Sequence, residues 1–183
     1  MFKIQYTIPL TLVALLAGCV LSGCKKNHYS VDAKPASSIT QQQQILVRES
    51  LPFNDELDFE LAEKGLIKRT EQFEILDDKG NVVWELGNYN FLLNESDHSS
   101  INPSLKRQAR LNMSYGLYKV TERIYQVRGY DLSNISFIKG DTGWIIFDPL
   151  LTPATAKAAF ALVTQELGEF PVKAVVYSHA HAD

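Results

Sequence analysis

The spacing of hydrophobic residues predicts two kinds of structure in the chain beyond residue 44. Up to about residue 120, short apolar stripes alternate with turn residues. Leu57, Leu61 and Ala62 fit a short helix that ends near Gly65. The stretch FEILDDKGNVVWEL, residues 73–86, holds two apolar runs around a polar turn with a glycine. This order of residues predicts a β-hairpin.

A second helix is marked at both ends. Asn102 can cap a helix with its side-chain oxygen, and Pro103 suits the first helical position because that position needs no backbone N–H donor. Gly116 is the kind of residue at which helices commonly end. We therefore expect residues 103–115 to be helical.

From residue 124 the pattern changes to that of β-strands. Three apolar runs follow one another, IYQVRGY at 124–130, ISFIK at 135–139 and WIIFD at 144–148. The last two are joined by GDTG at 140–143. A connection this short, with glycine at both ends, predicts an antiparallel hairpin.

One long helix and one strand follow this hairpin. Thr152 can cap the helix, Pro153 suits its first position and Gly168 marks its end. A single apolar stripe runs along it, formed by Ala156, Ala159, Phe160, Val163 and Leu167. The run VKAVVYS, residues 172–178, is apolar on both faces, so we expect a strand that is covered on both sides. Strand, helix and strand together predict a βαβ unit.

Three potential metal ligands follow that strand directly. His179, His181 and Asp183 are separated by one residue each, so in extended backbone their side chains point to one side. Ligands of open α/β sheets bind beyond the carboxyl ends of the strands, which is where these residues fall. Imidazole and carboxylate groups bind zinc, and catalytic zinc sites keep a position open for water. The alternative is a polar loop that merely ends a strand.

Composition and charge exclude some function classes. The 183 residues are 45% hydrophobic and 21% charged, which is an ordinary globular mixture. The formal net charge of -3 argues against nucleic-acid binding, because phosphate binding needs a concentrated basic face. The basic residues Lys106, Arg107 and Arg110 fall within the second predicted helix, and we expect them to form its solvated face.

The first 24 residues have the pattern of an export signal. Lys3 supplies a positive charge before an apolar run that is too short for a comfortable transmembrane helix. Two overlapping stretches, LAGC ending at Cys19 and LSGC ending at Cys24, resemble bacterial lipoprotein processing sites. We expect lipidation at Cys24, with Cys19 as the alternative, followed by a polar tether over residues 25–44 that runs into the start of a helix. An ordinary cleaved signal without a lipid is a further alternative.

A lipoprotein signal predicts an exported protein that is anchored to a membrane in the periplasm. Both cysteines lie within the signal, so the remaining chain has no thiol for a disulfide or for a metal. A metal site in that part must therefore use histidine and carboxylate ligands.

Three stretches of the sequence resemble one enzyme family. VVYSHAHAD, residues 175–183, is similar to the start of the His-x-His-x-Asp-His motif of the metallo-β-lactamase fold. Together with NPSLKRQARLN at 102–112 and the long stretch from Gly116 to Leu150, it resembles the bacterial alkyl sulfatases that hydrolyse detergents such as dodecyl sulfate. The resemblance runs from about Leu51 to Asp183 and keeps the order of the family's segments.

The resemblance implies a fold and an activity. The fold would be the N-terminal half of a metallo-β-lactamase-like αββα sandwich, a mixed α/β and α+β architecture over 121–183, preceded by a family-specific helical and hairpin region over 45–120. The family binds two zinc ions and hydrolyses sulfate esters to alcohol and sulfate with a metal-activated water. Carried over by position, His179 and His181 would bind the first zinc and Asp183 the second. A dimerisation region and a C-terminal domain that helps to hold the alkyl chain complete the family, so the full-length protein could form a homodimer.

Other polar residues of the sequence are possible members of the site or have a structural role. Asp131 and Asn134, in the stretch YDLSN, could line the site, although a purely structural role in a loop is the alternative. We expect Asp148 to be a structural turn residue. His28 and His98 match no ligand of the family, and we expect both to be ordinary exposed histidines.

The family pattern also continues beyond the residues present. The histidine expected after Asp183 and all later ligands are absent. We therefore expect this sequence to be the front portion of a longer enzyme and to be inactive alone, because isolated ligands without their supporting groups are poorly held. Two alternatives remain: another hydrolase of the metallo-β-lactamase fold, such as a lactamase or thioester hydrolase, and a non-catalytic lipoprotein remnant.

Overall fold

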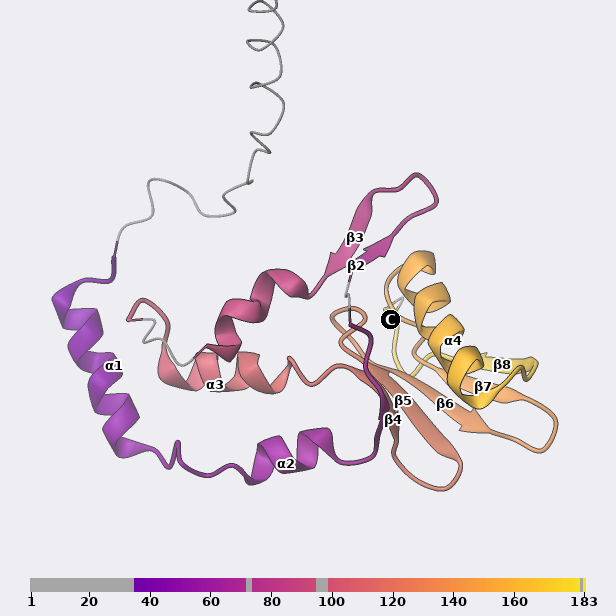
Figure 1. Cartoon of the computed structure of the whole chain (residues 1–183), viewed down its shortest axis with the longest axis horizontal. Helices are drawn as coiled ribbons and strands as arrows, with labels where there is room; N and C mark the ends of the chain where they lie inside the picture. Colours follow the sequence, from indigo (N-terminus) through magenta and orange to yellow (C-terminus); the bar gives the residue numbers. More distant parts are fainter. Residues whose placement is uncertain (1–34, 72–73, 95–98, 182) are drawn as a thin grey trace, which may run out of the picture. The chain divides into compact units, whose positions relative to one another are not determined.

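A six-stranded sheet with the strand order β1-β4-β5-β6-β7-β8 organises the computed structural model (Figure 1). The structure describes residues 35–71, 74–94, 99–181 and 183. The chain divides into two units, Met1–Pro35 and Ala36–Asp183, and every element below belongs to the second. The predicted signal, Cys19, Cys24, His28 and His98 lie outside the described residues. Within the described part, no helix has the length and apolar character needed to cross a membrane.

The strands fall into the large sheet and a separate hairpin. The sheet consists of β1 (Leu66–Lys68), β4 (Gly116–Lys119), β5 (Ile124–Arg128), β6 (Ile135–Lys139), β7 (Trp144–Phe147) and β8 (Val172–Val176). All neighbouring pairs are antiparallel except β7 and β8, which are parallel. The hairpin consists of β2 (Glu74–Leu76) and β3 (Val82–Glu85). The predicted hairpins over 73–86 and 135–148 are confirmed.

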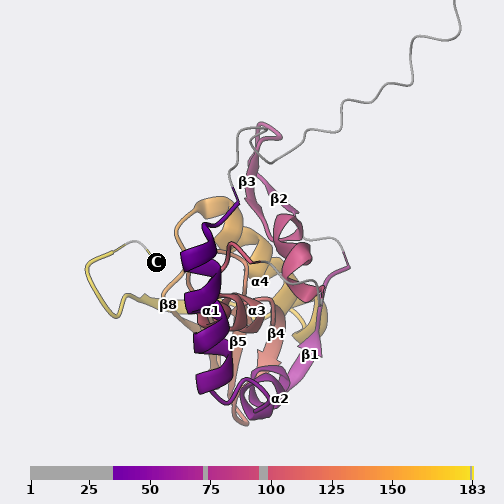
Figure 2. The same cartoon turned by 90° about the vertical axis from the view of Figure 1, so that its left-hand side faces the viewer.

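The helices lie in two groups, as Figures 1 and 2 show. One group comprises α1 (Ser38–Ser50), α2 (Leu57–Glu63), the 3-10 helix η2 (Gly87–Leu93) and α3 (Pro103–Leu111), and the first three all contact α3. The other is α4 (Pro153–Leu167), which connects β7 to β8 and packs against the sheet. This βαβ unit is confirmed, with Thr152 and Thr155 forming a reciprocal capping box at the start of α4.

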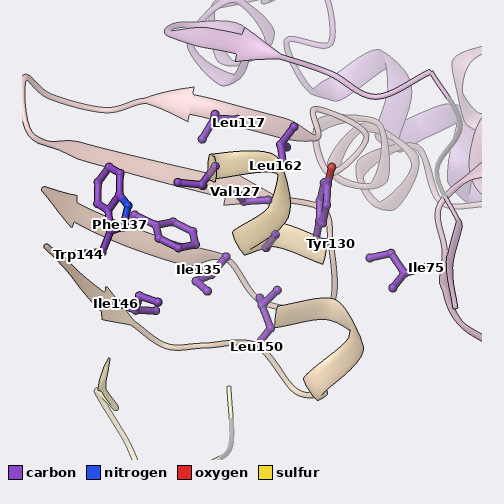
Figure 3. Packing of buried hydrophobic residues seen from close by; sticks show 12 residues of the cluster. Ile75, Leu117, Val127, Tyr130, Ile135, Phe137, Trp144, Ile146, Leu150 and Leu162 are labelled. Carbon is purple, nitrogen blue, oxygen red and sulfur yellow. The ribbon is translucent and has the colours of Figure 1, made fainter. Parts of the chain in front are cut away.

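The core lies between the sheet and α4 (Figure 3). Leu117, Val127, Phe137 and Trp144 come from four successive strands, and each is at most 1% exposed. Ala159, Leu162 and Val163 of α4 complete the cluster from the other side. Because these side chains all leave water on folding, this face of the sheet supplies the main hydrophobic stabilisation of the domain.

Three of the sequence predictions about elements need correction. The second helix, α3, is capped by Asn102 as predicted but ends at Leu111 rather than residue 115. Gly116 does not end that helix; it begins β4, a strand that was missed together with β1. A Cβ on Gly116 would lie 2.4 Å from the Lys68 carbonyl oxygen, so the close approach of β1 to β4 requires glycine here.

The other two corrections concern α1 and β8. Helix α1 begins at Ser38, capped by the Ser37 side chain, so the helical region starts inside the segment 25–44 that was expected to be a tether. Strand β8 was expected to be covered on both faces, but most of its residues are exposed. It is the edge strand of the sheet, and no residue of β8 belongs to the core cluster that α4 builds on the other strands.

The boundary expected at residue 120 also falls in an unusual place for a domain junction. It lies between β4 and β5, which are neighbouring antiparallel strands of one sheet. The N-terminal region and the strand-rich region therefore share hydrogen bonds across that position.

Candidate metal centre

The loop after β8 is fastened to the end of β7 by one residue pair. The Ser178 backbone N–H and hydroxyl each donate a hydrogen bond to a different oxygen of the Asp148 carboxylate, both at 2.8 Å. These bonds lower the pKa of Asp148, with the backbone N–H as the largest cause. Asp148 has a positive φ of 52°, which aspartate tolerates better than most residues. It therefore acts as the structural turn residue that the sequence predicted.

The three predicted ligands come together directly after this anchor. The Nε2 atom of His179 lies 3.1 Å from Nδ1 of His181 and 3.5 Å from Oδ1 of Asp183. One ligand atom from each residue can be chosen so that all lie within 4.8 Å of one another. The backbone conformation that brings the ligands together differs from the prediction. Residues 178–181 form bends, whereas extended chain was expected.

Two of the three ligand separations are close to what one zinc ion needs. Tetrahedral ligands at about 2.0–2.1 Å from zinc are roughly 3.3 Å from one another. The two measured distances lie on either side of that value. Two imidazoles and a carboxylate are also an accepted donor set for zinc. The side chains of His179 and Asp183 remain 44% and 22% exposed, so water can reach the point between them.

A serine that the sequence analysis did not single out orients the third ligand. The Ser133 hydroxyl donates a 2.5 Å hydrogen bond to Oδ2 of Asp183, leaving Oδ1 directed at His179. This bond is the first cause of the lowered pKa of Asp183. On the other side, the Ser178 hydroxyl lies 3.2 Å from Nδ1 of His179 and so helps to fix the ring. Such supporting partners set the orientation and basicity of metal ligands.

Asp131 and Asn134, the two residues considered as site-lining, have different surroundings. The Asp131 carboxylate is 6% exposed and accepts hydrogen bonds from the Leu151 N–H at 2.8 Å and the Thr155 hydroxyl at 3.0 Å. A 3.3 Å bond from the Ser133 N–H completes its contacts. Asp131 therefore ties the loop after β5 to the start of α4, next to the serine that holds Asp183. Asn134 borders a cavity of about 390 Å³ beside this loop.

Comparisons with known proteins point to one superfamily. Residues 128–183 match the model of the metallo-beta-lactamase superfamily. The chain is 42% identical over 173 residues to an (R)-specific secondary-alkylsulfatase of Pseudomonas sp, an alignment that covers 94% of this chain and 26% of that protein. It is 41% identical over 166 residues to the alkyl/aryl-sulfatase BDS1 of Saccharomyces cerevisiae, covering 90% of this chain and 26% of the relative.

A solved structure gives the same result for the fold. The stereoselective inverting sec-alkylsulfatase Pisa1 from Pseudomonas sp. superposes with a TM-score of 0.79 at 44% sequence identity. That superposition covers 85% of this chain and 24% of Pisa1. The chain thus spans about a quarter of the length of the relatives it matches. The expected metallo-β-lactamase-like fold is confirmed.

Proposed function

We propose that this chain, which is related over most of its length to alkylsulfatases of the metallo-β-lactamase superfamily, supplies part of the metal centre of an enzyme that hydrolyses alkyl sulfate esters. The reaction consumes one water and yields an alcohol and sulfate. Detergents such as dodecyl sulfate are substrates of this class. The observation that carries the proposal is the convergence of His179, His181 and Asp183, one ligand atom of each lying within 4.8 Å of the others.

Zinc is the metal that best fits these residues. Zinc bound by such a set lowers the pKa of a coordinated water and polarises an ester oxygen. The chain's own residues would present two imidazole nitrogens and one carboxylate oxygen to it. Ser133 holds the carboxylate and Ser178 holds the first imidazole. Assignment of the two histidines to one ion and of Asp183 to a second remains a prediction from the family.

The location and assembly of the enzyme are further parts of the proposal. The signal pattern and Cys24 support export and a lipid anchor at the periplasmic side of a membrane. A homodimer in the full-length protein is supported only by the resemblance to the family.

A chimera tests the proposed activity. Residues 36–183 would replace the matching quarter of the Pseudomonas secondary-alkylsulfatase, and sulfate release from alkyl sulfates would be followed. We expect activity that a chelator abolishes and added zinc restores. His181→Ala in the chimera should lose about 100-fold or more in rate, because a ligand is removed. His98→Ala serves as the matched histidine control and should keep full activity. A folded, zinc-loaded chimera that releases no sulfate would refute the proposal.

The chain by itself should behave differently. Its described part offers three ligands, with both histidines exposed. We therefore expect weak zinc affinity and no measurable sulfate release from the isolated chain.

A further inference from the structure

The end of the large sheet opposite the candidate metal centre carries an exposed cation on or just before five of its six strands. Strand β4 ends there at Lys119 and β6 ends there at Lys139, whereas β7 and β8 begin there and run toward the ligands. We call the exposed cations of this region the basic end: Lys64, Lys119, Arg123, Lys139 and Lys173.

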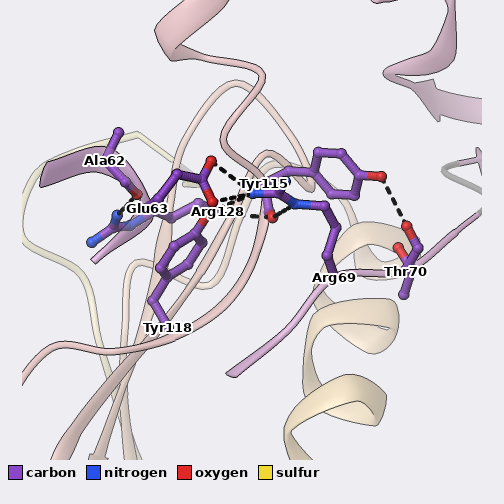
Figure 4. A network of polar contacts seen from close by, with 7 residues as sticks. All are labelled: Ala62, Glu63, Arg69, Thr70, Tyr115, Tyr118 and Arg128. Carbon is purple, nitrogen blue, oxygen red and sulfur yellow. Dashed lines mark hydrogen bonds and ion pairs between the residues drawn. The ribbon is translucent and has the colours of Figure 1, made fainter. Parts of the chain in front are cut away.

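The first cation of this row is held in place by a polar network (Figure 4). The Lys119 N–H donates to the Gly65 carbonyl oxygen at 2.7 Å, which places Lys64 beside β4. Directly before Lys64, both oxygens of the Glu63 carboxylate accept hydrogen bonds from Arg69, at 2.8 and 2.6 Å. Because Glu63 is used by Arg69, it does not neutralise Lys64.

The next cations are placed by contacts between neighbouring turns. The Lys139 N–H donates to the Arg123 carbonyl oxygen at 2.8 Å, and the Arg123 Nε donates to the Lys139 carbonyl oxygen at 2.9 Å. Lys173 packs on the turn that follows Lys139, because a Cβ on Gly143 would lie 2.6 Å from the Lys173 Cγ. The basic end is therefore a continuous row along one end of the sheet.

Carboxylates neutralise only part of this charge. Glu122 pairs with Lys119 at 3.2 Å, and Asp141 pairs with Arg123. Glu169, in the link from α4 to β8, adds a third exposed carboxylate. Within the described residues, no ion pair joins a carboxylate to the other cations of the basic end, Lys64, Lys139 and Lys173. The region thus keeps a positive charge, although the formal net charge of the whole chain is -3.

This arrangement suits an extended anionic surface better than a small anion. Neighbouring strands lie about 4.8 Å apart, so cations beside β1 and β8 are separated by roughly 24 Å. A single phosphate or sulfate cannot contact both, whereas the headgroups of an anionic bilayer can. Val120, in the turn between β4 and β5, is 49% exposed and adds an apolar contact at the same end.

We propose that the basic end binds the anionic headgroups of the membrane to which the predicted lipid anchor would attach this protein. Each Lys or Arg near an anionic bilayer improves binding by about fivefold, so the row alone would bind weakly. A basic patch together with a lipid chain is sufficient for stable attachment. Docking at this end would leave the metal ligands, at the other end of the strands, facing away from the bilayer. This inference shares the predicted anchor with the proposed function but requires no sulfate hydrolysis.

Lysine footprinting on the unchanged full-length chain tests the docking. The chain would be mixed with vesicles of phosphatidylcholine, with or without phosphatidylglycerol, and acetylated briefly before mass spectrometry. We expect the vesicles with phosphatidylglycerol alone to protect the lysines of the basic end, Lys64, Lys119, Lys139 and Lys173. Lys157 on α4, whose side chain is 81% exposed, is the internal control and should react equally with both kinds of vesicle.

Salt and a soluble polyanion sharpen this test. The protection should disappear in about 1 M salt, because the screening length falls to roughly 3 Å. Equal reactivity of the basic-end lysines with both kinds of vesicle would overturn the inference. Protection by heparin but not by the vesicles would also overturn it, because the partner would then be an anionic polymer.

Two double variants with the same loss of charge localise the contact. Lys139→Gln with Lys173→Gln removes two cations of the basic end, and the ratio of docked to undocked protein, read from protection of Lys119, should fall by about 25-fold. Lys79→Gln with Lys157→Gln removes two exposed cations elsewhere and should leave that protection unchanged. Equal protection of Lys119 in the two double variants would overturn the assignment to this end. Sulfate release is not measured here, so failure of the docking and failure of the proposed activity are distinguishable.

Discussion

The two loops that meet at the candidate metal centre differ in how firmly the protein holds them. The loop after β5 is buried where it leaves the strand, with Tyr130 and Asp131 at 4% and 6% exposed, although Leu132 is 82% exposed. The loop after β8 carries the ligands but is open to solvent, with Tyr177 56% exposed. The exposed loop is held by hydrogen bonds to its neighbours, from Ser178 to Asp148 and from Ser133 to Asp183. The buried start of the loop after β5, through Ser133, therefore supports a ligand that lies on an exposed loop.

The largest expected effect comes from destroying the buried support. Asp131→Ala removes a buried acceptor that ties together the Leu151 N–H, the Thr155 hydroxyl and the Ser133 N–H. We expect a loss of about 2–4 kcal/mol in the free energy of unfolding, measured by urea denaturation. Asp141→Ala, at a carboxylate that is 88% exposed, is the control and should change stability by less than about 0.5 kcal/mol. Similar losses in both variants would contradict the contrast between the loops.

Removing a ligand from the exposed loop should affect metal binding without affecting stability. His181 is exposed and makes its contact to His179, so His181→Ala should leave the urea midpoint of the metal-free protein nearly unchanged. Zinc affinity should fall by about 10–100-fold, measured by competition with a chromogenic chelator. A stable variant with undiminished zinc affinity would show that these three residues do not form the site.

The connection between the loops is tested by Ser133→Ala. Its loss removes the hydrogen bond that stabilises the charged form of Asp183, so the pKa of Asp183 should rise toward its ordinary value. We also expect a drop in zinc affinity of about tenfold, because an orienting partner is lost. The pKa is read from a carboxylate NMR titration of the metal-free protein. An unmoved pKa would show that Ser133 does not support the ligand loop in solution.

The smallest expected effect is the pH dependence of the other anchor. The hydrogen bonds from Ser178 lower the pKa of Asp148 below its ordinary value of 3.8. A depressed carboxylate pKa contributes stability that is present above the unfolded-state value and is lost as pH falls through the folded-state value. We expect the parent to be more stable than Asp148→Asn at pH 7, the difference to begin to shrink below about pH 4, and to be lost as the pH falls through the lower folded-state pKa. A difference in urea midpoint that stays constant from pH 7 to pH 3 would argue against this anchor.

Much of the fold could be predicted from local signals. The cap Thr152, the proline after it and the stop at Gly168 define α4, because each acts through its own neighbouring residues. Strand β4 was missed although one of its partners, β5, follows it closely, because its other partner, β1, lies far earlier in the chain. Leu117 pairs with Val127 and with Lys68, and the chain around Gly116 looks locally like the end of a helix.

The candidate site, too, could be predicted from the sequence only in part. The ligands His179, His181 and Asp183 could be predicted because they form a short motif. The bends that bring them together could not, since extended backbone was the simplest expectation. Ser133 gave no signal because its partner, Asp183, lies 50 residues further along the chain. Its one local clue was its place between Asp131 and Asn134, in a loop already suspected of approaching the site.

The turn at the end of β7 also limits which residues can replace Leu150. Its φ of 73° is unfavourable for a leucine, yet the side chain is 3% exposed and belongs to the core cluster. Glycine would relieve roughly 1–3 kcal/mol of backbone strain and forfeit about 1.5–3 kcal/mol of burial, so the two effects nearly cancel. A β-branched residue would keep the burial but add strain. The backbone and the core therefore place opposing demands on the side chain at this position.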